Sequence, residues 1–307
     1  MKEDVSISFA VSGVKGYNLL KSSTLNRDVN IRKVFIYEKN NILYENFKHL
    51  CEDKNISWYE TQHIEEYLKI LKDEKSDLLI VSGWGYKIPK EVFTVAKKGV
   101  VVLHDSLLPK NRGFCPSFWA LLNGEKTTGV TAFFIDEGID SGDIIFQEKT
   151  KISIDDDINS LTEKIIGLYD RVLSKIIACL KQGIDLPRTR QRESEATYCH
   201  RRCPEDALID WNKRVVDIIN LLKVSKKPYF EAYTFYKGKK LFVIEAEESA
   251  QSNSKDSLPG SILLSGVDRG VSVSAKDGVV KLKKIRFEGE KIKNAYDLVS
   301  TGDCLGV

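Results

Sequence analysis

The sequence lacks any apolar run that approaches the length of a membrane-spanning helix. It also lacks a cleavable apolar region at its start, where MKEDVSISFAVSG leads straight into a strand pattern. Its six cysteines are scattered along a chain without a secretory signal, which argues against a disulfide-stabilised scaffold. These absences predict a cytoplasmic protein with reduced thiols.

A strong charge bias and a complete set of metal ligands are also missing. The net charge is only +3, with −1 before Tyr198 (28 basic and 29 acidic residues) and +4 in the remainder (19 basic and 15 acidic). A nucleic-acid-binding protein usually carries a strongly basic surface, so we do not expect nucleic acid as a partner. A zinc site needs four ligands, and no second pair accompanies Cys199, His200 and Cys203, so we expect no metal.

The first half of the chain is rich in alternating strand and helix patterns. Buried strands are predicted at residues 5–11, 31–37, 56–60, 77–83, 99–104 and 129–136. Helical spacing is found between them, at residues 12–20, 42–55, 64–76, 89–98 and 118–125. Continuous apolar strands that alternate with helices predict an α/β, Rossmann-like domain whose mostly parallel sheet is covered on both faces. Ligands of such folds bind outside the carboxyl ends of the strands.

Three polar, glycine-rich segments follow these strands, at residues 82–89, 104–113 and 135–143. We expect them to converge on one crevice at the carboxyl edge of the sheet. The second segment begins with His104, which can take or give a proton near neutral pH. A carboxylate that orients this ring would complete a general acid–base pair, and the third segment offers four of them, Asp136, Glu137, Asp140 and Asp143.

The other motifs are weaker evidence for a function. A single histidine at a strand end is structural about as often as it is catalytic. The GxSxG elbow of serine hydrolases is absent, and GVKG after the first strand lacks the three-glycine spacing of a dinucleotide site. Lys110 and Arg112 could meet an anionic substrate. The loop around His104 therefore carries most of the functional signal.

The second half predicts a separate module. A long helical pattern covers residues 161–183, and the polar segment 187–200 is interpreted as a linker. A helix at 215–224 and a hairpin at 230–249 follow, with further strands at 261–266, 270–278 and 279–289 and a helix at 293–300. We therefore predict a first domain at 1–186, a linker at 187–200 and a smaller strand-rich domain at 201–307.

The motifs LHDSLLPKNRG, WALLNGEKTTGVT and IDEGIDSGDI resemble those of the folate-dependent formyltransferases. YCHRRCPEDALIDWN (198–212) is similar to the segment that opens the second, OB-like domain of the methionyl-tRNA and nucleotide-sugar enzymes in that family. The resemblance implies transfer of a formyl group from 10-formyltetrahydrofolate to a primary amine, with His104 and Asp140 as catalytic residues. The expected folate-binding residues are Trp84, Tyr86, Ile88, Asp136 and Ile139. The expected substrate-binding residues are Ser106, Lys110, Arg112 and Phe114.

One position departs from the family motif. Where the family has an asparagine that hydrogen-bonds the formyl oxygen, two residues before the histidine, this chain has Val102, which cannot donate. Asp105 cannot replace it, because in a continuing strand 102 and 104 share a face and 105 points away. Val102 leaves open a non-catalytic homologue that binds folate or a nucleotide sugar.

The acceptor is predicted from the region after the second strand. The tRNA enzymes of the family have a basic insertion there, whereas residues 38–55 have no basic cluster. We therefore expect a nucleotide-linked amino sugar, and with it a role in lipopolysaccharide or other surface-polysaccharide biosynthesis. Methionyl-tRNA is the alternative acceptor, and a homodimer is left open.

Overall fold

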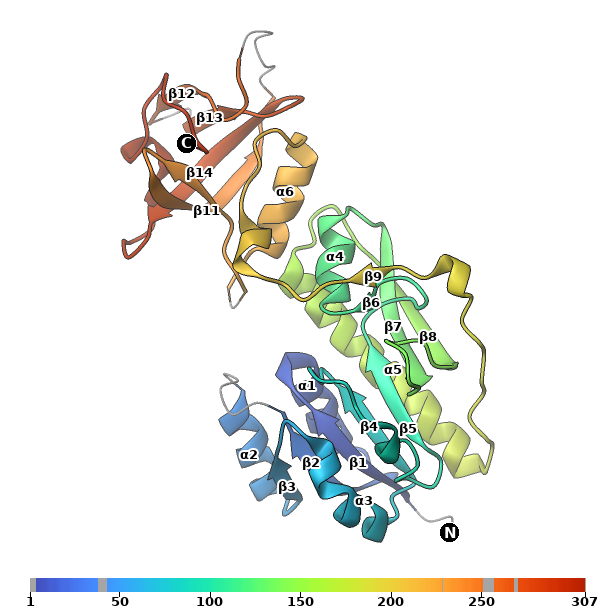
Figure 1. Cartoon of the computed structure of the whole chain (residues 1–307). Coiled ribbons are helices and arrows are strands. Elements are labelled where there is room, and N and C mark those ends of the chain that lie inside the picture. Colours follow the sequence, from blue (N-terminus) through green and yellow to red (C-terminus); the bar gives the residue numbers. More distant parts are fainter. Residues whose placement is uncertain (1–3, 38–42, 228, 251–256, 268–269, 307) are drawn as a thin grey trace. The chain divides into compact units, whose positions relative to one another are not determined.

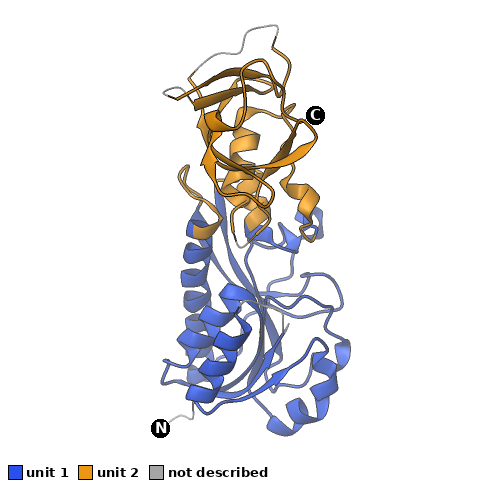
Figure 2. Ribbon diagram, turned by 90° about the vertical axis from the view of Figure 1, so that its left-hand side faces the viewer, with its two compact units in different colours: residues 1–117, 127–151, 160–200 blue, residues 118–126, 152–159, 201–307 orange. Residues whose placement is uncertain are grey.

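The computed structural model describes residues 4–37, 43–227, 229–250, 257–267 and 270–306. They form two compact units, shown in Figure 2. The first consists of residues 1–117, 127–151 and 160–200, and the second of residues 118–126, 152–159 and 201–307. The segment 187–200, predicted as a linker, is therefore grouped with the first unit.

The first unit is built on a seven-stranded sheet with the order β3-β2-β1-β4-β5-β7-β8 (Figure 1). Its strands are β1 (Val5–Val11), β2 (Val29–Ile36), β3 (Ser57–Glu60), β4 (Leu78–Ser82), β5 (Val100–His104), β7 (Thr127–Phe134) and β8 (Ile144–Lys151). The first five are parallel, whereas β7 runs antiparallel to β5, and β8 antiparallel to β7. The prediction of a mostly parallel α/β sheet is confirmed.

The first unit also contains helices and a 3-10 turn. They are α1 (Gly13–Ser23), α2 (Tyr44–Asp53), the 3-10 turn η1 (Ile64–Tyr67), α3 (Leu68–Glu74) and α5 (Ile158–Gln182). Most of α4 (Pro116–Leu122) is grouped with the second unit. An apolar cluster joins Ala10, Leu79 and Val100 of the strands to Ile64 and Leu71 of the η1–α3 segment. No helix within the described ranges is long and apolar enough to span a membrane.

The helix predicted at residues 89–98 is wrong, because only the 3-10 turn η2 (Lys90–Val92) forms there. The apolar spacing is nevertheless used, since Ile88, Val92 and Val95 are all buried in the cluster. The backbone N–H groups of residues 97 and 98 donate to the carbonyls of residues 76 and 77 before β4, instead of to the preceding turn of a helix. The segment thus buries the apolar residues that a helix would bury, although its backbone is irregular.

The second unit contains a six-stranded antiparallel sheet and α6 (Val215–Val224). Its strands are β10 (Tyr233–Tyr236), β11 (Lys239–Glu248), β12 (Ile262–Gly266), β13 (Gly270–Ser274), β14 (Val279–Phe287) and β15 (Lys293–Asn294). The predicted strand-rich domain is confirmed. The helix predicted at 293–300 is not formed, and β15 followed by the 3-10 turn η5 (Ala295–Asp297) stands in its place.

Candidate active site

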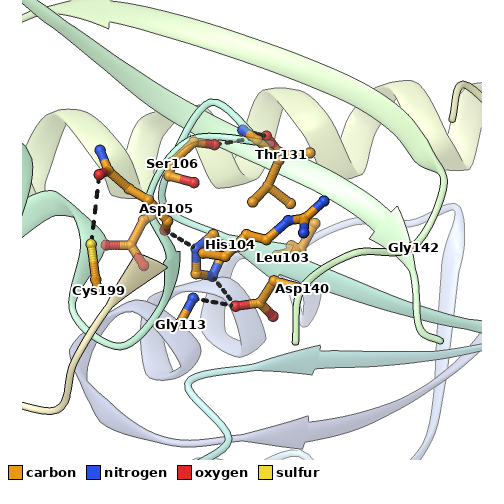
Figure 3. A network of polar contacts seen from close by, with 12 residues as sticks. Leu103, His104, Asp105, Ser106, Gly113, Thr131, Asp140, Gly142 and Cys199 are labelled. Atoms are coloured by element: carbon orange, nitrogen blue, oxygen red, sulfur yellow. Dashed lines mark hydrogen bonds and ion pairs between the residues drawn. The ribbon is translucent and has the colours of Figure 1, made fainter. Parts of the chain in front are cut away.

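His104 lies at the carboxyl end of β5 and is held from two sides (Figure 3). Its Nε2 atom is 2.9 Å from the carbonyl oxygen of Asn111, and its Nδ1 atom is 3.6 Å from Oδ2 of Asp140. The residue is 7% exposed. Both neighbours are hydrogen-bond acceptors, so only the doubly protonated ring can donate toward both at once. The sequence prediction that His104 and an acid of segment 135–143 lie together agrees with this arrangement.

Asp140 reaches His104 by a route that the sequence does not predict. Because β7 is antiparallel, Phe134 at its carboxyl end pairs with Val101, near the start of β5. The loop at 135–143 therefore begins at the opposite edge of the sheet from His104 and runs back toward it. There, Oδ2 of Asp140 accepts a hydrogen bond of 2.7 Å from the N–H of Gly113. The expectation that this loop starts at the carboxyl edge of a parallel strand is corrected.

The loop that carries Asp140 has a tightly specified backbone. Asp140 itself has φ = 50°, in the left-handed region that asparagine and aspartate tolerate better than most residues. Gly142 has no room for a side chain, since a Cβ there would lie 1.7 Å from the carbonyl oxygen of Phe134. Asp136 accepts hydrogen bonds from Ser141 Oγ and the N–H of Gly138, at 2.8 and 3.1 Å. Asp136 therefore shapes the loop.

The other expected folate-binding residues differ in exposure. Tyr86 and Ile139 are exposed, and Trp84 is half-buried with its ring 5.4 Å from that of Tyr37. Ile88 is buried in the apolar cluster of the fold, which is the position of a core residue. Folate contacts of these side chains and of Asp136 stay a prediction.

Two of the four expected substrate-binding residues face inward. Ser106 is fully buried and donates to the carbonyl of Lys110 at 2.8 Å. Arg112 is 1% exposed, and all three of its guanidinium nitrogens have partners within the chain, among Gln191, Glu193 and Tyr198. In this structure the two side chains shape the loop, and contacts of Ser106 and Arg112 to substrate stay a prediction. Lys110 and Phe114 are exposed, and their contacts to substrate stay a prediction.

Sequence reasoning missed the segment 187–200, which we call the strap. Its strand β9 (Tyr198–Cys199) pairs with β6 (Arg112–Gly113). Thr197 accepts from the backbone N–H groups of both Asn111 and Arg112, each at 2.8 Å. Gly113, with φ = 97°, is required by this pairing, because a Cβ there would lie 2.5 Å from the carbonyl oxygen of Cys199. The strap therefore fixes the loop that contacts His104.

Thr131 and Gln147 hold the same loop from the sheet, and sequence reasoning missed them too. Thr131 pairs with His104 across β5 and β7, and its hydroxyl donates to the carbonyl of Ser106 at 2.7 Å. The Gln147 amide donates to Thr131 and to the carbonyl of Leu108, both at 2.8 Å. A threonine in a strand and a glutamine in an edge strand are too common to have signalled these roles.

Asp105, next to His104, forms a partly buried ion pair. It lies on the other side of the strand end, where it contacts the ammonium of Lys15 from α1 and the hydroxyl of Ser117. Burial raises the pKa of the Asp105 carboxyl, but the charges of Lys15 and His104 outweigh burial and lower it to about 2. Val102 instead is partly buried and packs against the apolar cluster. Asp105 therefore does not take the place of the family asparagine.

We expect Lys15→Met to lower the free energy of unfolding at pH 7 by about 3 kcal/mol, the lower end of the cost of removing one partner of a buried ion pair, because Asp105 keeps its burial and loses its cationic partner. A carboxyl whose pKa is depressed in the folded state stabilises the fold above its unfolded pKa and stops doing so as the pH falls through its folded pKa. The difference between variant and wild type should therefore shrink as the pH falls below about 4 toward 2. Urea unfolding across this range measures it.

Lys21→Met is the matched control, because Lys21 is an exposed lysine in the last turn of the same helix. If Lys15→Met is as stable at pH 7 as Lys21→Met, the ion pair with Asp105 does not stabilise the fold.

Metal ligands do not gather in the part of the chain that the structure describes. No group of three or more histidine, cysteine, aspartate or glutamate side chains there could hold a metal ion.

Two family models match the chain. Residues 36–177 match "Formyl transferase" and residues 203–301 match "Formyl transferase, C-terminal domain". The methionyl-tRNA formyltransferase of Caldanaerobacter subterraneus subsp. tengcongensis is 35% identical over 226 residues, which cover 74% of this chain and 71% of that protein. About a quarter of this chain lies outside the comparison with this relative.

Solved structures share the fold. An N-formyltransferase from Helicobacter canadensis, in complex with folinic acid and dTDP-3-aminofucose, has a TM-score of 0.64 at 17% identity and covers 91% of this chain and 99% of its own. HypX from Aquifex aeolicus in complex with tetrahydrofolic acid has a TM-score of 0.66 at 17% identity and covers 96% of this chain. This chain spans about half the length of HypX, 46%. At these identities the likeness concerns the fold alone.

Proposed function

The chain is an enzyme of the folate-dependent formyltransferase family, whose formyl donor is formyl-tetrahydrofolate, and we propose that its acceptor is the primary amine of a nucleotide-linked amino sugar. The observation that carries the proposed chemistry is the His104–Asp140 pair, with Nδ1 and Oδ2 3.6 Å apart at the end of β5. General acid–base catalysis needs a proton-carrying group oriented by a fixed partner, and this pair supplies both.

The roles of the two residues follow from the reaction. The folate donor supplies the activated formyl carbon and leaves as tetrahydrofolate, while the amine must give up a proton. His104 is proposed to act through Nδ1, which is 3.6 Å from Oδ2 of Asp140 and so beyond hydrogen-bond distance of it, whereas Nε2 already contacts the carbonyl of Asn111. Nδ1 would hydrogen-bond the formyl oxygen as it gains negative charge, and the ring would carry the amine proton to the leaving folate nitrogen. Asp140 is proposed to stabilise the positive ring while it does so. The carbonyl of Asn111, 2.9 Å from Nε2, orients the same ring from the other side.

The choice of a sugar acceptor rests on charge. Residues 38–55 carry three lysines against four acidic residues, and the chain from Tyr198 onward has a net charge of only +4. Binding of tRNA depends on many phosphate contacts from lysine and arginine. The small excess of basic residues therefore favours a smaller anion as the acceptor. Lys110 and Phe114, which are exposed near His104 in sequence, are the proposed contacts to the nucleotide.

Methionyl-tRNA is the second candidate, and one observation favours it. The curated relative from Caldanaerobacter, at 35% identity, is a methionyl-tRNA formyltransferase. The two candidates differ in the size of the acceptor and in the salt dependence expected for its binding, because each phosphate contact adds to that dependence.

A direct assay separates the candidates. The purified chain is incubated with 10-formyltetrahydrofolate and either a panel of dTDP-, UDP- and GDP-linked amino sugars or methionyl-tRNA. Release of tetrahydrofolate is followed by absorbance, and the formylated amine is identified by mass spectrometry. We expect turnover with one class of amino sugar and none with methionyl-tRNA. Turnover with methionyl-tRNA alone would overturn the sugar proposal and leave the formyltransferase assignment intact.

Val102→Asn tests whether the site works without the family asparagine. An oxyanion donor is typically worth about 10²–10³-fold in rate, so a defective site should gain strongly from its return. We expect no gain in kcat/KM and a lower melting temperature, because Val102 packs against apolar neighbours and an amide there lacks partners. Val102→Ala is the control, since it shortens the side chain without adding a polar group. A large gain with Val102→Asn would mean that valine impairs the native enzyme.

A further inference from the structure

Gln191 lies in the strap and has its side-chain amide fully engaged. The residue is 8% exposed. Its Nε2 atom donates to the carbonyl oxygens of Asp140 and Gly142, each at 2.8 Å. Its Oε1 atom accepts from Nε and Nη2 of Arg112, at 3.2 and 3.0 Å. A glutamine amide has two N–H donors and one acceptor oxygen with two lone pairs, so these four bonds use its whole capacity.

The four bonds join the two loops that hold the His104–Asp140 pair. On one side, Arg112 stands between Asn111, whose carbonyl contacts the ring of His104, and Gly113, whose N–H contacts the carboxylate of Asp140. On the other side is the backbone of Asp140 itself. The contacts therefore form a closed circuit from His104 through the 111–113 loop, Gln191 and Asp140 back to His104.

We propose that Gln191 is a positioning residue that fixes Asp140 against His104. The proposal rests on the catalytic roles given to these two residues above, and deepens them by naming what sets their geometry. Gln191 acts through Asp140 and does not itself face the reacting atoms.

The backbone of the Asp140 loop explains why it needs such support. A non-glycine residue with a positive φ persists only where its surroundings hold it, and Asp140 has φ = 50°. The loop also starts beside Val101, at the far end of β5, and must return along the strand to reach His104. A small displacement of its tip would move the carboxylate away from a ring that is already 3.6 Å distant.

A substitution of Gln191 in the strap tests the positioning role. Gln191→Leu preserves the approximate volume and removes all four hydrogen bonds. We expect kcat to fall by up to about 10²-fold, the cost of misplacing a catalytic group by about 1 Å, with little change in KM for the amine. Arg192→Gln is the matched control, because Arg192 is next in the chain, with its side chain 80% exposed and paired with Glu195, three residues further on.

Gln191→Glu gives a readout that a loss of packing would not. The new carboxylate can still accept from Arg112, but its other oxygen faces the carbonyls of Asp140 and Gly142 without a proton to donate. Protonation restores one donor, so the ratio of its kcat to that of wild type at the same pH should rise as the pH falls. This variant also keeps the proposal testable if Gln191→Leu does not fold.

A double-mutant cycle with Asp140→Asn completes the test. If Gln191 acts through Asp140, the two losses are not independent, and the double variant is less impaired than their product predicts. The positioning role is overturned if a folded Gln191→Leu is no slower than Arg192→Gln, if the losses simply multiply, or if the Gln191→Glu ratio is flat with pH. If Asp140→Asn and His104→Ala are themselves fully active, the catalytic assignment fails, independently of Gln191.

Discussion

Replacement of His104 by alanine is expected to lower kcat by about 10²–10⁴-fold, the usual contribution of a general acid–base. His104 is the residue at the end of β5 whose two ring nitrogens face fixed partners, Asn111 and Asp140. Removing the ring leaves the backbone of the loop held by Thr131 and by the strap, so the fold should persist. Steady-state kinetics with the preferred amine and a thermal melt measure the two effects separately.

His49→Ala is the control for this prediction. His49 lies on α2 with its side chain 71% exposed, so its loss changes neither the site nor the core. If His104→Ala retains the turnover of His49→Ala, the imidazole has no part in the mechanism. A His104→Ala variant that is inactive and also unfolded would instead show that the ring is needed for the fold, contrary to the expectation above.

The parallel core of the sheet could be predicted from the sequence because each of its strands is a short apolar run. The run GVVVLH (99–104) predicts a strand buried on both faces, and it forms β5. The run IIFQEKTK was not predicted as a strand, although it forms β8 at the edge of the sheet. Five of its eight side chains are polar, and from Phe146 onward partly buried and exposed positions alternate, which removes the apolar continuity that identified the others.

The candidate site could be predicted only where a side chain follows directly from a strand. His104 is the last residue of β5, so its location depended on one local pattern. The location of Asp140 depended on the direction of β7, which a single apolar run does not reveal. Arg112 was assigned to substrate because it is charged and lies in a loop, yet loop position does not say whether a side chain faces outward. Its partners Gln191 and Glu193 lie about 80 residues later in the chain.

Asp140→Asn is the second change for which we expect a large effect, on the order of 10²-fold or more in kcat. Asparagine is nearly the size of aspartate and is among the residues that tolerate a positive φ, so the backbone at φ = 50° should be kept. Its side-chain oxygen can still accept from the N–H of Gly113. What is lost is the negative charge beside Nδ1 of His104, and with it the stabilisation of the positively charged ring.

Single-turnover kinetics and a separate measurement of folate affinity test this reasoning. We expect the chemical step to slow while folate binds nearly as tightly as to wild type, because the loop keeps its shape. Asp143→Asn, in the same loop but paired with Arg188 at the surface, controls for a general effect of removing a carboxylate there. A loss confined to folate affinity would make Asp140 a binding residue, and the proton carried by His104 would then need no charged partner at 140.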